Sequence, residues 1–276
     1  MNDLYSTEML IAFAVGLLAT GAIAGVLAGL LGVGGGIVIV PVLFWLAGIL
    51  GVSPEVAMPM AVGTSLATII PTSISSARAH RKRGSVDVDL LKAWAPAVFV
   101  GALIGGVLAG FVSGMFLTAL FGAVALLVAI NLALPRTIVL AEDLPQGLVA
   151  RTTVPTGIGV FSALMGIGGG TLSVPILSAF SYPVHKAIGT AAALGLVIAV
   201  PAVCGFIWAG WGADLRPPLS FGYVSVPAAV LIFSMSVLTA PYGSGLAHRL
   251  DAKPLKRLFA LFLFVTAMRM LWQVVA

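Results

Sequence analysis

The sequence predicts an all-α polytopic membrane protein, and three observations lead to that prediction. Hydrophobic residues make up 60% of the 276 positions and charged residues only 8%, whereas about a quarter of a soluble protein is charged. Long intervals contain no Asp, Glu, Lys or Arg, which leaves room for many helices of about 20 apolar residues. These intervals are 9–54, 56–77, 93–135, 152–184, 187–213 and 217–247. Runs such as 119–134 are apolar on every face, unlike the alternating strands of a membrane β-barrel.

Two parts of the chain repeat each other around a cluster of glycines. Residues 31–43 read LGVGGGIVIVPVL, and residues 165–177 read MGIGGGTLSVPIL. Further along, the sequence VGTS at 62–65 is echoed by IGTA at 188–191. An internal duplication is therefore predicted. Its parts are a first repeat at 1–135, a cytoplasmic linker at 136–149 and a second repeat at 150–276.

Each repeat is predicted to contain about five helical segments. A long apolar segment comes first, the glycine cluster interrupts it, and a short apolar segment and three further spans follow. Glycine clusters and charged loops set the bounds. In the first repeat the segments are 9–31, 37–50, 57–78, 93–111 and 115–134. In the second they are 150–166, 171–182, 187–210, 221–246 and 255–274.

The charges of the loops predict that the two repeats are inverted. Lys and Arg in short loops favour the cytoplasmic side. The loop 78–92 is rich in both, whereas its counterpart 211–220 has a single Arg. The next pair reverses this bias, since 112–114 is uncharged and 248–257 is basic. We therefore expect a multi-pass membrane protein with both termini outside.

The two glycine clusters predict a binding site for a small anion. Three consecutive glycines unwind a helix, and freed backbone groups inside a membrane need protein or a watered cavity beside them. Helix resumes after each cluster, so its N–H groups and positive dipole end would face an anion. We expect both breaks to meet near the midplane, as in inverted-repeat transporters; close packing by small residues is the alternative. The predicted substrate-binding residues are Gly34, Gly35, Gly36, Thr64, Ser65, Gly168, Gly169, Gly170, Thr171 and Thr190.

Three further residues stand near the predicted ends of the spans. Arg78 and His80 end the third segment, and Lys186 precedes the second Gly-Thr element. They could form a vestibule that collects anions. Orientation in the membrane, contact with lipid headgroups and snorkelling to the surface are the alternatives.

Other classes of protein fit the sequence poorly. An enzyme would need a nucleophile with its base or clustered metal ligands, but the His residues stand at span boundaries and Cys204 has no evident base nearby. No cofactor and no metal are expected. The net charge is +5, but the basic residues cluster in short loops between helices, as orientation in a membrane requires. Nucleic acid is therefore not an expected partner. The expected partners are a small anion and the lipid bilayer, and a homodimer is left open.

Taken together, these motifs resemble the TauE/SafE family of membrane permeases. The resemblance rests on both glycine clusters with Pro41 and Pro175 behind them, on the Gly-Thr elements and on the stretch AHRKRGSV at 79–86. It covers essentially the whole chain. It implies a secondary transporter that exports sulfite or organosulfonates across the inner membrane. An anion channel of the same architecture and a membrane sensor are the alternatives.

Overall fold

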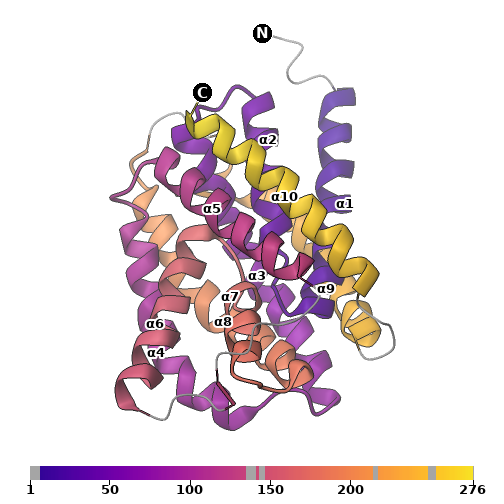
Figure 1. Ribbon diagram of the computed structural model, residues 1–276. Coiled ribbons are helices and arrows are strands. Elements are labelled where there is room, and N and C mark those ends of the chain that lie inside the picture. Colours follow the sequence, from indigo (N-terminus) through magenta and orange to yellow (C-terminus); the bar gives the residue numbers. More distant parts are fainter. Residues whose placement is uncertain (1–6, 135–140, 143–146, 214–216, 248–252, 276) are drawn as a thin grey trace.

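The computed structural model describes residues 7–134, 141–142, 147–213, 217–247 and 253–275, and they form a bundle of helices (Figure 1). Seven of the described helices are long and apolar enough to cross a membrane. The predicted all-α class of a polytopic membrane protein is confirmed. The helices of the predicted first repeat are α1 (Thr7–Leu31), α2 (Gly36–Ile49), α3 (Pro54–Lys82), α4 (Val88–Leu108) and α5 (Gly114–Ala133). The helices of the predicted second repeat are α6 (Leu148–Met165), α7 (Gly170–Ala179), α8 (Val184–Ala209), α9 (Val226–Ala247) and α10 (Lys253–Val275).

Several helices extend beyond the predicted segments into charged sequence. α3 begins at Pro54, whose fixed φ suits a first helical turn, and ends among basic residues that favour the negative end of the helix dipole. α4 begins at Val88 rather than at 93, because the Asp87 side chain caps the N–H groups of its first turn. Charge marks the edge of the apolar span, whereas capping decides where the helix begins.

A short hairpin precedes α9 where the sequence predicts the start of a helix at 221. Strands β1 (Ser220–Phe221) and β2 (Val224–Ser225) pair antiparallel. Gly222 between them has a φ of 57°, in the left-handed region that a glycine adopts without strain. The prediction that a helix starts at 221 is wrong, because a turn containing Gly222 reverses the chain there.

Small residues allow the helices to approach one another closely. Gly21, Gly25 and Gly29 on α1 meet the backbone of α9, at Ile232, Ser236 and Ala240 in the same order. α1 and α9 therefore run parallel. Gly101 and Gly105 on α4 meet Thr156 and Val160 on α6, so these two helices also run parallel. Rows of small residues are how membrane helices pack without a hydrophobic driving force between them.

α3 and α8 form the centre of the bundle and cross in opposite directions. Gly63 on α3 lies against Phe206 on α8, and Ser73 on α3 lies against Gly195 on α8. These are also the two helices with the most buried spans. α3 and α8 carry the two Gly-Thr elements and cross antiparallel, as the predicted inversion would have it. The inverted repeat itself stays a prediction.

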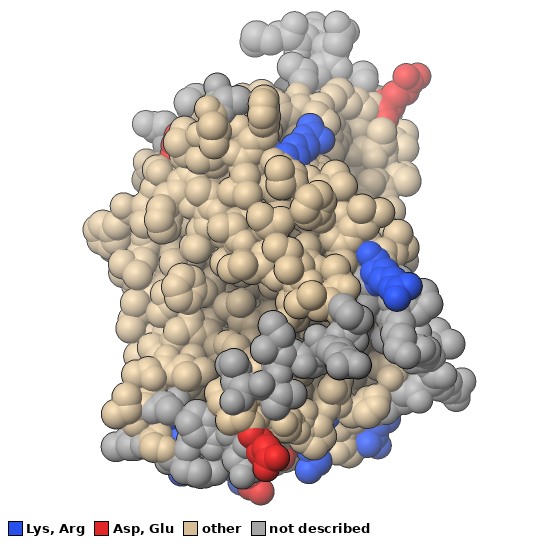
Figure 2. Space-filling view, viewed as in Figure 1, with Lys and Arg blue, Asp and Glu red and all other residues tan. Residues whose placement is uncertain are grey.

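Both ends of the described chain lie at the same end of the molecule. α1 begins and α10 finishes at the upper end in Figure 1. On the face drawn in Figure 2, Lys and Arg gather at the lower end, and the middle is almost free of charged side chains. The predicted linker 136–149 lies largely outside the described residues. The placement of both termini outside the cell stays a prediction.

Candidate functional site

The helices break where the glycine clusters stand. α1 ends at Leu31 and α2 begins at Gly36; α6 ends at Met165 and α7 begins at Gly170. The first break holds three left-handed residues, Gly32, Gly34 and Gly35, with φ between 70° and 80°. In the second break the left-handed residue is Gly166, with a φ of 67°. The repeated sequence therefore takes two different backbone paths.

The two breaks meet in direct backbone contact. The N–H of Gly168 donates to the carbonyl of Val33 at 3.2 Å. A Cβ added to Gly34 would lie 2.9 Å from the Cα of Gly168, and one added to Gly168 would lie 2.6 Å from the Val33 oxygen. The described residues of both breaks are buried. We call this contact between the two glycine breaks the crossing. No side chain fits between the two backbones there, so a ligand would have to lie beside the crossing.

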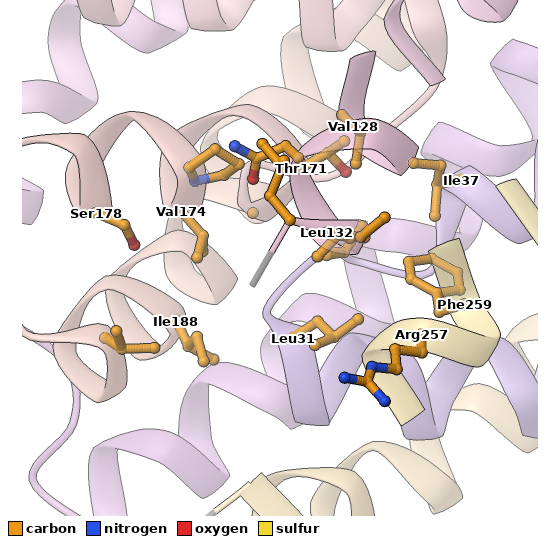
Figure 3. Close-up of a pocket in the computed structure, with 17 residues that line it drawn as sticks. Leu31, Ile37, Val128, Leu132, Thr171, Val174, Ser178, Ile188, Arg257 and Phe259 are labelled. Atoms are coloured by element: carbon orange, nitrogen blue, oxygen red, sulfur yellow. The ribbon is translucent and has the colours of Figure 1, made fainter. Parts of the chain in front are cut away.

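A cavity of about 520 Å³ lies beside the crossing, between α5, α7, α8 and α10 (Figure 3). Leu31, Val33 and Ile37 of the first break form part of its wall, and Gly170 and Thr171 of the second break form another part. In Figure 3 the α7 residues lie on one side and those of α10 on the other. Polar side chains reach the cavity from three helices. They are Asn131 of α5, Thr171 and Ser178 of α7, and Arg257 of α10.

Thr171 is the polar group most deeply placed in this wall. It is 2% exposed, and its Oγ1 has no hydrogen-bond partner within the described part of the chain. It stands in the first turn of α7, where backbone N–H groups have no partner inside the helix and the dipole is positive. A buried hydroxyl without a partner is costly unless a ligand or water meets it. This end of α7 is therefore suited to an anion.

Three other predicted residues use their hydroxyls to join the repeats. Thr64 Oγ1 accepts from the N–H of Ser225, and Thr190 Oγ1 accepts from the N–H of Asp87, both at 2.9 Å. Ser65 Oγ donates to the carbonyl of Gly166 at 2.7 Å. The first two bonds are reciprocal, since each ties a central helix to a loop of the other repeat. None of the three threonine and serine residues lines the cavity.

Four of the six predicted glycines form the contact between the two breaks. They are Gly34, Gly36, Gly168 and Gly170, and Gly170 also lines the cavity. Gly35 packs against Ala24 and Gly169 against Ala191.

Arg78, His80 and Lys186 do not line the cavity, and each has different neighbours. Arg78 is exposed in a groove between α3 and α9. His80 is 1% exposed, and its Nε2 donates to the carbonyl of Gly29 at 2.7 Å, so its side chain faces α1. Lys186 lies 3.8 Å from the carboxylate of Asp87. Within the described residues, no three His, Cys, Asp or Glu side chains gather as metal ligands would.

Asp87 connects the two repeats at the end of the bundle where α4 begins. Its Oδ2 accepts a hydrogen bond of 2.6 Å from the Tyr182 hydroxyl, and its Oδ1 accepts from the N–H groups of Asp89 and Leu90. The bond from Tyr182, followed by that from Leu90, holds the pKa of Asp87 below its ordinary value. Burial and the same bond raise the pKa of Tyr182. The carboxylate is thus bound most tightly in its charged form.

Replacing Asp87 by asparagine is expected to reduce the pH dependence of stability below about pH 4. A group whose folded pKa is lowered stabilises the fold above its unfolded pKa, and this stabilisation is lost as the pH falls through the folded value. The thermal unfolding midpoint of the detergent-solubilised protein should therefore fall less steeply in acid for Asp87→Asn. Asp89→Asn, which removes an exposed carboxylate beside it, should keep the wild-type slope. Equal slopes for Asp87→Asn and the wild type would contradict this assignment.

Comparison with known proteins identifies the family. The family model described as "Sulfite exporter TauE/SafE" matches residues 17–270, which is most of the chain. The chain belongs to the TauE/SafE family. A probable membrane transporter protein of Haemophilus influenzae is 36% identical over 255 residues, covering 92% of this TauE/SafE chain and 96% of the relative. A probable membrane transporter protein of Methanocaldococcus jannaschii is 26% identical over 262 residues, covering 92% and 94%. No solved structure matches the chain significantly.

These matches confirm the resemblance predicted from the two glycine clusters. This TauE/SafE member is a multi-pass membrane transporter protein. Two cavity residues, Asn131 and Arg257, were not predicted as site residues. Asn131 is an amide inside an otherwise apolar span, and Arg257 belongs to a basic loop used above only for orientation. The isolated amide was the signal that could have pointed to the cavity.

Proposed function

We propose that this TauE/SafE protein exports a small sulfur-containing oxyanion, sulfite or an organosulfonate, across the bacterial cytoplasmic membrane by alternating access. One observation carries the proposal. The cavity beside the glycine breaks combines the unpartnered Thr171 hydroxyl, the positive end of α7 and the Arg257 side chain. Donors of this kind bind an oxyanion without a metal or a titrating carboxylate.

The position of the cavity supports access from one side at a time. Val184 and Ile188 in the first turns of α8 line it, so it extends toward the end of the bundle where Asp87 and Lys186 lie. Past the crossing, the contact between Gly34 and Gly168 closes the path toward the other end. Rocking one repeat against the other would close the first route and open the second. The reciprocal bonds of Thr64 and Thr190 are the contacts expected to change in that step.

Energetics favour export of an anion. An inside-negative membrane potential supplies about 2.3 kcal/mol per charge for each 100 mV. An anion bound at Thr171 and Arg257 can therefore leave the cell without a second energy source, and a proton carried by the substrate is an additional route.

The experiment is a flux measurement with the full chain in proteoliposomes. Vesicles are loaded with radiolabelled sulfite, sulfoacetate, sulfate or thiosulfate, and voltage and pH gradients are imposed separately. We expect saturable efflux of sulfite or the sulfonate that rises with inside-negative voltage and is accelerated by unlabelled substrate outside. Unitary currents without such exchange would favour the channel. Binding without any flux would favour a sensor, and either result would contradict the proposal.

A further inference from the structure

We infer that the groove between the end of α3 and the second half of α9 binds one phospholipid with an anionic headgroup. The groove has a volume of about 540 Å³ and shares no lining residue with the cavity at Thr171. Its basic residues are Arg78, Lys82 and Arg83, and its apolar residues include Pro71, Ile74, Val237 and Pro241. The site therefore joins a cationic end to an apolar channel.

The cationic end is built from residues of one helix face. Arg78 and Lys82 stand four residues apart on α3, which places them on adjacent turns of the same side, and both are exposed. The guanidinium of Arg83 donates to the carbonyl of Ala79 at 3.0 Å and to the hydroxyl of Ser244 on α9 at 3.1 Å. These bonds hold Arg83 across the two helices. No carboxylate is among the described residues that line the groove, so its charge is uncompensated there.

The groove is long enough for a headgroup and part of an acyl chain. From Pro71 to Lys82 the helix rises about 16 Å, at about 1.5 Å per residue. Half of the hydrocarbon core is about 15 Å thick. The cationic end from Arg78 to Lys82 takes about 6 Å of this length. A lipid whose phosphate lies between Arg78 and Lys82 would thus place the part of its acyl chain nearest the headgroup along the apolar residues as far as Pro71.

The apolar part of the groove selects a lipid over a free anion. An inorganic anion would leave Ile74, Val237 and Pro241 uncovered, whereas an acyl chain would cover them. Two neighbouring side chains of α9, Leu238 and Tyr242, are 62% and 73% exposed, which is typical of a surface that faces lipid. Basic pockets between helices at the end of a membrane span bind anionic headgroups, each Lys or Arg contributing about fivefold in affinity.

The test uses the purified full-length protein in a neutral detergent. Phosphatidylglycerol, phosphatidylcholine and glycerol phosphate are titrated, and bound lipid is counted by native mass spectrometry. We expect phosphatidylglycerol to bind with a stoichiometry near one at this site, and the Arg78→Gln/Lys82→Gln protein to bind it about 25-fold more weakly. The matched control is Arg81→Gln/Lys92→Gln, which removes the same charge from α3 and α4 outside the groove. It should change the affinity by less than about twofold.

Three results would overturn the inference. Equal binding of phosphatidylcholine and phosphatidylglycerol would mean that the basic residues do not select an anionic headgroup. An equal loss of affinity in both double variants would mean that binding depends only on the net charge of the protein. Binding of glycerol phosphate as tight as that of the lipid would mean that the apolar channel takes no acyl chain. Thermal unfolding of each variant without lipid shows whether a loss of binding reflects a loss of fold.

Discussion

Gly168→Ala and Gly34→Ala are each expected to reduce transport at least about tenfold. They should destabilise the protein by about 1–3 kcal/mol at Gly168 and about 2–5 kcal/mol at Gly34. A Cβ on Gly168 would lie 2.6 Å from the Val33 oxygen and 2.8 Å from the Cα of Gly34. Both obstacles are backbone atoms, so no side chain can move aside. At Gly34 the φ of 73° adds the strain of a left-handed residue to a similar contact. The measurement combines flux in proteoliposomes with thermal unfolding in detergent.

Glycines in open helical positions provide the control for these substitutions. Gly157 on α6 and Gly16 on α1 have no atom within 4 Å of an added Cβ. Alanine there should leave flux unchanged and slightly raise stability, because alanine favours a helix by about 0.5–1 kcal/mol over glycine. If Gly168→Ala behaves like Gly157→Ala in both measurements, the two breaks do not meet as described.

Arg257→Gln is expected to raise the substrate concentration for half-maximal flux about 10- to 150-fold. Among the described residues that line the cavity, Arg257 is the one with a formal charge. A hydrogen bond between an ionised donor and an anion contributes about 1.5–3 kcal/mol, which corresponds to that range. The wild-type rate should also fall with rising ionic strength more steeply than that of the variant, since an exposed charge steers an anion through a field that salt screens.

The control for Arg257 lies on the same helix. Arg269 has its guanidinium 4.7 Å from the centre of the Trp45 ring and does not line the cavity. Arg269→Gln should lower stability through the lost cation–π contact and leave the half-maximal concentration unchanged. Arg257→Lys should keep part of the affinity, because a lysine retains the charge without the planar donor fork. Equal effects of Arg257→Gln and Arg269→Gln on anion affinity would place the anion elsewhere.

Much of the fold could be predicted because it depends on local properties of the chain. The charge-free intervals predicted the spans, and the glycine clusters marked both helix breaks, at Leu31–Gly36 and Met165–Gly170. The hairpin at 220–225 was missed, since each strand has only two residues and carries no periodic signal. The start of α4 was placed too late, because charged residues were taken as the limit of the helix.

Only some of the predicted site residues line the cavity. Thr171, Thr64 and Thr190 look alike in the sequence, as hydroxyls near repeated glycines. In the structure Thr171 faces the cavity, whereas Thr64 and Thr190 accept backbone hydrogen bonds from the opposite repeat. The sequence does not show which distant group a hydroxyl will bind, because that depends on how the helices pack.

The sequence by itself therefore determined the membrane class, the duplicated glycine breaks and the family, because apolar length and backbone freedom are properties of contiguous residues. Only the tertiary structure decided that Gly34 and Gly168 touch backbone to backbone and that Asn131, Thr171 and Arg257 share one cavity. Asn131, Thr171 and Arg257 lie on three helices far apart in the chain. The packing of those helices decides which of their side chains face one another.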